Sequence, residues 1–230
     1  MRSERYSRNQ NALSEEEQAL LAQKRLLVAG CGGLGGYVVE FLGRLGVGYI
    51  RVVDGDVFEE SNLNRQLLSS GMNLGRPKVL AAQQRMLTIN PQVEVEGLQV
   101  FFAEDNALEL LQGCDLAVDA LDNIPARRLM QQAARETRIP LVHGAIAGWA
   151  GQVCVIRPGE NWLDLLYGDL KAERGEELEA GNLSFTAGVV AALQAAEAVK
   201  LLLGKVGLQG ELLQVDLLNS AFERIALGPK

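Results

Sequence analysis

Short apolar runs and helical periods alternate along the first part of the chain. The run from Arg25 to Ala29 (RLLVA) predicts a buried strand, and the period from about Tyr37 to Leu45 predicts a helix. A second strand, Tyr49 to Val53, ends at Asp54. Strand, helix and strand in this order form a βαβ unit, so we expect parallel strands joined by right-handed crossovers.

The same alternation extends over most of the chain. Further helices are predicted at 15–24 (opened by a Ser-x-x-Glu capping box), 78–88, 107–112 and 126–136, and strands at 93–100, 115–119, from 140, and at 152–156. An apolar helix at 187–204 precedes two antiparallel strands, 212–216 and 221–227. We therefore expect one α/β domain, residues 1–230, with a Rossmann-like doubly wound, mostly parallel sheet and antiparallel strands toward the C-terminus.

Two segments stand apart from this pattern. Residues 1–24 form an N-terminal arm and helix. Residues 157–184 are rich in Pro, Gly, Asn and acidic residues, and two interpretations are open: a solvated linker, or a mobile crossover loop beside a functional site. The second is reasonable because long loops within ordered domains are often functional.

The apolar segment from Ala187 to Gly204 raises the question of a membrane span. It carries Gln194, Glu197 and Lys200 on consecutive turns, so a buried amphipathic helix is the better interpretation. The N-terminal residues lack the apolar core of a signal peptide. We expect a cytoplasmic protein without a membrane partner.

Composition and charge narrow the function further. Hydrophobic residues make up 48% of the chain, which suits a sizeable core, and the net charge is −7. Without a basic excess, broad binding to nucleic acid or to an anionic membrane is not expected. Three widely spaced cysteines, no C-x-x-C pair and a single histidine predict reduced thiols and no structural zinc.

A glycine-rich loop follows the first strand. Gly30, Gly32 and Gly35 give G-x-G-x-x-G between a strand and a helix, with Asp54 about 20 residues further on. The helix N-terminus favours anions, and Asp54 is placed to accept hydrogen bonds from a ribose. This signal alone indicates only a nucleotide, and an NAD-dependent oxidoreductase would share it. Because no Gly-Lys-Ser/Thr ends the loop, phosphate charge must be balanced from elsewhere.

Residues that can balance a polyphosphate come directly after the second strand. Asp54 and Asp56 precede Ser-Asn-Leu-Asn-Arg-Gln at 61–66, which is followed by Gly-Arg-Pro-Lys at 75–78. Arg65 offers a planar fork and Lys78 a point charge. A dehydrogenase has no evident use for this stretch.

A third polar cluster, residues 119–123, ends the DLAVD strand. Ligands of open parallel sheets bind outside the carboxyl ends of the strands. A carboxylate at this position can hold Mg²⁺ against phosphates. We assign Asp122 to that ligand and Asp119 to a structural role at the strand end.

Together these motifs resemble a known family. GCGGLG, DGD at 54–56, SNLNRQ, GRPK and ALDN occur in the order seen in the ThiF/MoeB/HesA adenylyltransferases, the bacterial relatives of ubiquitin-activating enzyme. The resemblance extends to Arg5-Tyr6-Ser7-Arg8 and to QAAEAVKLLLG at 194–204, and thus covers nearly the whole chain.

The resemblance implies an ATP- and Mg²⁺-dependent enzyme that adenylates the C-terminal carboxylate of a small ubiquitin-like sulfur-carrier protein ending in Gly-Gly. It implies a homodimer, in which Arg8 reaches the partner's site as an arginine finger. Asp122 would coordinate Mg²⁺, and Arg8, Arg65, Lys78 and Asp122 would be catalytic. The nucleotide-binding set would be Gly30, Gly32, Gly33, Gly35, Asp54, Asp56, Asn62, Arg65, Gln66, Lys78, Asp122 and Asn123.

The chain departs from the family at its cysteines. Two zinc-binding C-x-x-C pairs of many relatives are absent, and residues 176–181 have no cysteine. Covalent chemistry in that loop is therefore not expected. The reaction would stop at the acyl-adenylate, with sulfur supplied by a separate sulfurtransferase or desulfurase. We expect Cys31 and Cys154 to be small buried residues and His143 to be a packing residue at a strand end.

Three alternatives remain at this point. A tRNA-modifying dehydratase of the same superfamily is disfavoured by the acidic balance. A NAD(P) oxidoreductase is disfavoured by SNLNRQ and Lys78. A catalytically silent nucleotide-binding subunit is disfavoured because Arg8, Arg65, Lys78 and Asp122 are all present.

Overall fold

One eight-stranded sheet organises the chain in a computed structural model that describes residues 4–168 and 180–228. The strand order is β3-β2-β1-β4-β5-β6-β7-β8. The strands are β1 (Arg25–Ala29), β2 (Tyr49–Val53), β3 (Glu94–Leu98), β4 (Leu116–Asp119), β5 (Leu141–Ala147), β6 (Ala150–Ile156), β7 (Glu211–Asp216) and β8 (Ala221–Ala226).

Helices lie in most of the connections between these strands, whereas tight turns join β5 to β6 and β7 to β8. The α-helices are α1 (Glu15–Leu21), α2 (Gly35–Leu45), α3 (Lys78–Ile89), α4 (Ala107–Leu111), α5 (Ile124–Thr137), α6 (Trp162–Tyr167) and α8 (Ser184–Leu202). Two short 3-10 helices, η1 (Glu4–Asn9) and η2 (Glu60–Asn62), precede α1 and α3. The capping box predicted before α1 is present, because Ser14 and Glu17 exchange side-chain-to-backbone hydrogen bonds.

The strand pairing changes from parallel to antiparallel once along the sheet. Strands β3, β2, β1, β4 and β5 pair in parallel, whereas β6, β7 and β8 pair antiparallel. The change falls at the tight turn between β5 and β6, where Gly148 has a φ of +56° and Ala147 pairs with Ala150. The predicted mixed sheet is therefore confirmed, including its antiparallel strands toward the C-terminus.

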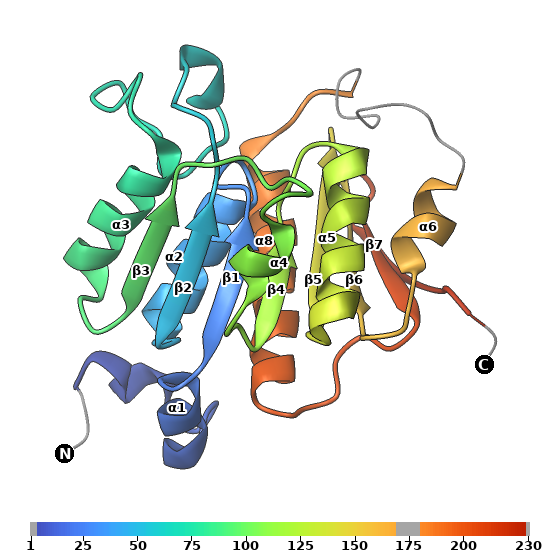
Figure 1. The fold of residues 1–230 in the computed structure, drawn as a ribbon, viewed down its shortest axis with the longest axis horizontal. Helices are drawn as coiled ribbons and strands as arrows, with labels where there is room; N and C mark the ends of the chain where they lie inside the picture. The colour runs from blue at the N-terminus through green and yellow to red at the C-terminus, as the bar shows by residue number, and fades with distance from the viewer. Residues whose placement is uncertain (1–3, 169–179, 229–230) are drawn as a thin grey trace.

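Alternating residues of β1 supply two separate cores. Leu26 and Val28 belong to the cluster shared with α2, α3 and α8, whereas Leu27 and Ala29 belong to the cluster shared with α4, α5 and α6. Figure 1 shows α4 and α5 on the near face of the sheet and α8 on the far face. Since successive strand side chains point to opposite faces, an uninterrupted apolar run is what a doubly wound fold requires.

Helix α8 is long and apolar enough to meet the criteria for a membrane span. Its position in the fold is that of a core helix, because Ala187, Val190 and Ala191 lie fully buried in the α2 cluster. Two predicted polar positions are also buried with partners: Gln194 donates to the carbonyl of Asp119, and Glu197 accepts from Leu208 N–H.

Residues 157–184 were expected to form a linker or a loop, but part of this segment is helical. It contains α6, whose Leu163 and Tyr167 are buried four residues apart on one helical face. The sequence did not predict this short helix, because the residues around it are mostly polar. Helix α8 also begins at Ser184, before the predicted start at 187. Residues 169–179 lie outside the described residues, so the mobility predicted for that part of the segment stays a prediction.

Candidate active site

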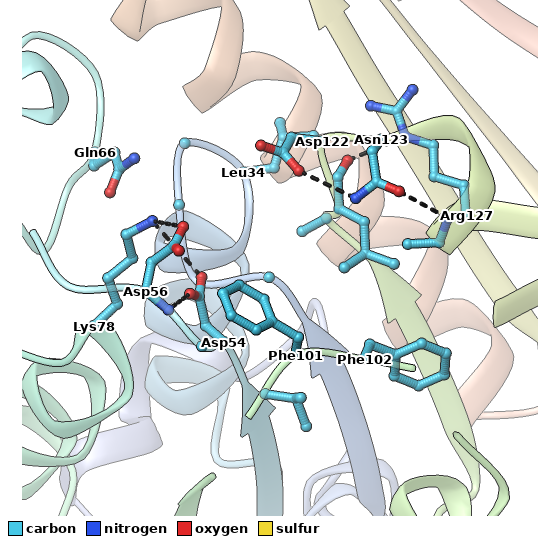
Figure 2. A pocket seen from close by; sticks show the side chains of 18 of the residues that line it. Leu34, Asp54, Asp56, Gln66, Lys78, Phe101, Phe102, Asp122, Asn123 and Arg127 are labelled. Atoms are coloured by element: carbon cyan, nitrogen blue, oxygen red, sulfur yellow. Dashed lines mark hydrogen bonds and ion pairs between the residues drawn. The ribbon is translucent and has the colours of Figure 1, made fainter. Parts of the chain in front are cut away.

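A cavity of about 700 Å³ opens where β1, β2 and β4 end. The crossovers reverse direction between β1 and β4, because β1 leads to β2 on one side and β4 leads to β5 on the other. A switch point of this kind is where open α/β sheets bind ligands. Figure 2 shows one polar cluster on each side of the cavity: Asp54, Asp56 and Lys78 on one, and Asp122, Asn123 and Arg127 on the other.

The glycine loop is packed against the end of β4. Gly30 has a φ of +90°, and a Cβ placed on it would lie 2.4 Å from the carbonyl oxygen of Ala120. A Cβ on Gly35 would lie 1.8 Å from the carbonyl oxygen of Gly30. These two positions exclude any side chain. Gly35 does not line the cavity, whereas Gly30 does.

Two other glycines face the cavity without such crowding. Gly32 and Gly33 line it, and a Cβ on Gly33 would meet no described protein atom closer than 3.9 Å. Helix α2 starts directly after them, and its N-cap Leu34 makes no side-chain capping hydrogen bond. Of the first-turn N–H groups, that of Gly36 donates to the carbonyl of Gly32 at 3.3 Å, so it is the others that can meet an anionic ligand.

Asp54 is held rigidly at the end of β2. Its two carboxylate oxygens accept from the N–H groups of Cys31 (2.7 Å) and Asp56 (2.8 Å). Burial is the largest influence on this carboxyl group and raises its pKa, against the opposing charge of Lys78. Asp54, the residue predicted to bind the ribose, therefore also anchors the glycine loop to the end of β2.

Lys78 reaches the same place from the first turn of α3. Its side chain is 8% exposed, and Nζ lies 2.9 Å from Oδ2 of Asp56 and 4.0 Å from Oδ2 of Asp54. A buried ammonium group facing a polar cavity can balance phosphate charge. All three residues line the cavity, as predicted from the sequence.

The SNLNRQ segment contributes Arg65 and Gln66 to the cavity. Gln66 is buried, and among the described residues its Oε1 atom has no hydrogen-bond partner. One end of this carboxamide is thus free to meet a ligand. Asn62 does not line the cavity; its Oδ1 accepts from Glu59 N–H at 3.1 Å and shapes the turn that presents Arg65.

Asp122 and Asn123 form the opposite wall. Asp122 is exposed in the cavity, where its carboxylate is available to a cation and to phosphate oxygens. Asn123 lines the cavity too, but its Oδ1 caps α5 by accepting from Ala126 N–H at 2.8 Å. Because of this cap, α5 begins at Ile124, two residues before the predicted start.

The cavity residues that were not predicted from the sequence include Phe101, Phe102, Arg127 and Asn182. Phe101 is 67% exposed, and Figure 2 shows its ring between Asp54 and Phe102. The paired aromatic residues directly follow the carboxyl end of a predicted strand, which was the available signal. Arg127 and Asn182 carried no local signal.

His143 is more than a packing residue at a strand end. It is fully buried, and Nδ1 lies 2.7 Å from Oδ2 of Asp119, which is fully buried as well. Asp119 Oδ1 accepts from Leu121 N–H at 2.9 Å. Asp119 therefore has the predicted structural role at the end of β4, and the description of His143 is corrected.

All three cysteines are buried and unpaired with one another. Burial raises the pKa of the Cys31 and Cys154 thiols far above their ordinary value, and it also raises the pKa of Cys114. Cys31 and Cys154 are fully buried small residues, as expected. Thiols in such surroundings are poor nucleophiles.

Arg8 does not line the cavity of its own chain. It is an exposed residue of η1, which lies with α1 beyond the amino ends of the parallel strands, opposite the cavity (Figure 1). The neighbouring Tyr6 anchors η1 by accepting from Asn90 Nδ2 at 2.9 Å. The predicted role of Arg8 in a partner's site stays a prediction.

Comparison with known proteins identifies relatives over nearly the full chain. The ThiF family model matches residues 6–230. The chain is 37% identical over 228 residues to "SAMP-activating enzyme E1" of Haloferax volcanii, covering 96% of this chain and 84% of the relative. It is 39% identical over 227 residues to "Sulfur carrier protein adenylyltransferase" of Thermus thermophilus, covering 92% and 82%. The crystal structure of E. coli MccB has the same fold, with a TM-score of 0.83, 20% identity and coverage of 98% and 70%.

Proposed function

The chain belongs to the ThiF family, and we infer that it is an ATP-dependent adenylyltransferase that acts on a small ubiquitin-like sulfur-carrier protein. Relatives more than 30% identical over most of the chain are named for that activity. The observation that carries the inference is the cavity itself, which joins a glycine loop, the cations Arg65 and Lys78, and the carboxylate of Asp122.

The chemistry is an in-line substitution at phosphorus. A carrier carboxylate oxygen attacks the α-phosphorus of ATP, forming a new P–O bond as the bond to the bridging oxygen of the β-phosphate breaks. Pyrophosphate leaves with that electron pair, and an acyl-adenylate remains. No proton transfer is needed at the reacting atoms, so the enzyme contributes positioning and charge stabilisation.

We propose that the phosphates lie between the glycine loop and the η2 turn. The N–H groups at the start of α2 and the side chains of Arg65 and Lys78 would meet their charge. Gln66 would supply its unpartnered carboxamide. Asp54 would accept a ribose hydroxyl, and the exposed ring of Phe101 would cover the base.

Asp122 fits the role of a Mg²⁺ ligand. It is an exposed carboxylate facing the proposed phosphate position, and Mg²⁺ is commonly bound by one or two carboxylates together with substrate phosphates and water. Within residues 4–168 and 180–228 no group of three or more His, Cys, Asp or Glu side chains could hold a metal. Bound Mg²⁺ would neutralise phosphate charge that Arg65 and Lys78 do not reach.

We further propose that the carrier ends in Gly-Gly, that the enzyme acts as a cytoplasmic homodimer, and that Arg8 completes the partner's site. The buried thiols of Cys31, Cys114 and Cys154 favour a reaction that ends at the acyl-adenylate. Sulfur would then come from a separate sulfurtransferase or desulfurase.

Carrier-dependent exchange of labelled pyrophosphate into ATP tests this function. We expect exchange that needs both a Gly-Gly carrier and Mg²⁺, and a loss of about a hundredfold or more in Asp122→Ala, corresponding to about 3 kcal/mol of barrier. Asp105→Ala is the matched control, because Asp105 is exposed outside the cavity. Exchange by Asp122→Ala at the rate of the control would contradict the assignment of Asp122. ATP binding without exchange for any carrier would contradict the proposed substrate.

A further inference from the structure

The backbone of Leu121, one residue before Asp122, is held by hydrogen bonds at both its N–H and its carbonyl group. Its N–H group donates to Asp119 Oδ1 at 2.9 Å. Its carbonyl oxygen accepts from Arg127 Nε at 3.0 Å. Asp119 ends β4 and Arg127 belongs to α5, so the turn that carries Asp122 is fixed between two elements.

Two residues from other elements close these bonds into a ring. His143 of β5 lies 2.7 Å from Asp119 through Nδ1, and its Nε2 lies 3.2 Å from the hydroxyl oxygen of Tyr167, the last residue of α6. Arg127 Nη1 donates to that hydroxyl oxygen at 2.8 Å. The ring runs from Leu121 through Asp119, His143, Tyr167 and Arg127 and returns to Leu121.

The protonation states give every bond in the ring a donor and an acceptor. Burial lowers the pKa of His143, so its imidazole is neutral at physiological pH. Burial raises the pKa of Tyr167 to about 12, so its hydroxyl keeps its proton. Nδ1–H of His143 then donates to Asp119, Tyr167 O–H donates to Nε2, and Arg127 donates to the Tyr167 oxygen.

The four side chains of the ring are buried. Asp119 and His143 are fully buried, Arg127 is 4% exposed and Tyr167 is 9% exposed. In such surroundings an unmade hydrogen bond is expensive, so the five residues hold one another in a single arrangement. Only Arg127 of the four side chains lines the cavity. The hydrogen bonds of the ring thus connect His143 and Tyr167 to the cavity through Leu121 and Arg127.

We propose that His143 and Tyr167 are positioning residues for the adenylation reaction, and that they hold Asp122 at the phosphates through the Leu121 peptide. This rests on the proposed function, in which Asp122 binds the metal that contacts ATP. Breaking the ring at Tyr167 removes the hydrogen bond that Arg127 Nη1 donates there, and it weakens the support that Arg127 gives to the Leu121 carbonyl. Asp122 then spends less time at the position where it binds a cation.

The experiment uses Tyr167→Phe, which keeps the aromatic side chain and its buried volume and removes only the hydroxyl group. Tyr49→Phe is the matched control, because Tyr49 is equally buried and its hydroxyl also bonds a partner, Glu96, away from the cavity. We expect Tyr167→Phe to lower the maximal exchange rate about tenfold, the equivalent of one buried hydrogen bond. The concentration of Mg²⁺ at half-maximal rate should rise severalfold, whereas the affinity for ATP measured without a divalent cation should change less than about twofold.

A second readout does not require a carrier protein. Calorimetry measures how strongly Mn²⁺ raises ATP affinity in the wild type, Tyr167→Phe, Asp122→Ala and the double variant. If Tyr167 acts through Asp122, Tyr167→Phe weakens the Mn²⁺ effect in the wild type and changes nothing in Asp122→Ala. This cycle tests the positioning role separately from the proposed substrate. If the wild type shows no pyrophosphate exchange, the proposed substrate is contradicted, but the effect of Mn²⁺ on ATP affinity can still be measured in all four proteins.

A variant of His143 gives a further comparison. His143→Asn places an amide nitrogen where Nδ1 stands and loses the contact to Tyr167, so it should resemble Tyr167→Phe. The positioning role is overturned if Tyr167→Phe, folded as well as Tyr49→Phe, keeps the wild-type Mn²⁺ effect. It is also overturned if the loss is equally large in Asp122→Ala.

Discussion

The ammonium group of Lys78 lies 2.9 Å from the carboxylate of Asp56, although the Lys78 side chain is 8% exposed and that of Asp56 is 54% exposed. A buried cation is thus paired with an anion that water can still reach. An incoming phosphate can take over the ammonium group while Asp56 returns to solvent. Desolvation of the cation is already complete before ATP arrives, which favours binding of a polyanion.

Replacement of Lys78 should therefore reduce nucleotide affinity and leave the protein folded. We expect Lys78→Met to weaken ATP binding at least about tenfold. The unfolding free energy should fall by about 1–3 kcal/mol, because Asp56 can be hydrated whereas the buried Asp54 loses a nearby opposite charge. Calorimetry with ATP and urea denaturation measure the two effects. Lys205→Met removes a partly exposed ion pair with Glu17 and should leave ATP binding unchanged. Equal ATP affinities for the two variants would contradict the role of Lys78.

The glycine loop offers a separation of folding from binding. Gly33→Ala meets no described protein atom closer than 3.9 Å, so we expect a stability change within about 0.5 kcal/mol. Its methyl group faces the cavity and should weaken ATP binding about tenfold or more. Gly30→Ala should cost more than about 2 kcal/mol of stability, because of its positive φ and the contact with Ala120.

Thermal denaturation and ATP titration check both glycine variants. Gly71→Ala is the control, since Gly71 is exposed and has no atom within 4 Å of an added Cβ. Unchanged ATP affinity in Gly33→Ala would contradict the proposed position of the phosphates at that part of the loop.

The buried imidazole makes stability depend on pH. Its pKa is lowered from 6.5 by burial, so the unfolded chain takes up a proton in this range while the folded chain does not. Stability is unaffected by this group well above pH 6.5 and falls as the pH drops from 6.5 toward the folded-state pKa. We expect the loss from pH 7.5 to 5.5 to be about 1 kcal/mol larger in the wild type than in His143→Gln.

Urea denaturation at the two pH values measures that difference. His143 is the only histidine in the chain, and subtracting the variant removes the contribution of carboxyl groups. Identical pH dependence in the two proteins would show that His143 titrates alike in the folded and unfolded states.

The proposed role of Arg8 can be tested by complementation between protomers. Arg8→Ala and Asp122→Ala should each be nearly inactive in pyrophosphate exchange. In an equal mixture allowed to exchange subunits, half of the dimers are mixed and one of their two sites is intact, so about a quarter of the wild-type activity should return. Activity that does not rise on mixing would contradict an arginine supplied by the partner.

Prediction from sequence succeeded where local pattern decides structure. The apolar runs of β1, β2 and β4 and the glycine loop gave the sheet and the cavity, because strand ends of a parallel sheet converge. The residues at 54, 56, 65, 66, 78, 122 and 123 line the cavity as predicted. Their roles toward ATP remain predictions until they are tested.

What was missed depends on contacts between distant residues. Tyr167 lies 24 residues from His143 and 40 from Arg127, and its helix has only six residues inside a polar segment. No local period identifies such a partner. Asn62 and Asn123 were assigned to the nucleotide because of their motifs, yet both use Oδ1 to accept backbone N–H groups. A motif names the residue, but only the fold shows where each polar atom is directed.

The position of α8 has a consequence for how the protein is made. This helix covers β4, β5 and β6 and packs on α2, so it completes the core beneath the glycine loop with residues 184–202 (Figure 1). A nascent chain that has reached only β6 already contains most of the cavity residues, but it leaves an apolar sheet face open to solvent. Such faces invite aggregation during synthesis. We therefore expect the emerging polypeptide to be prone to aggregation until α8 has been synthesised and has covered this face.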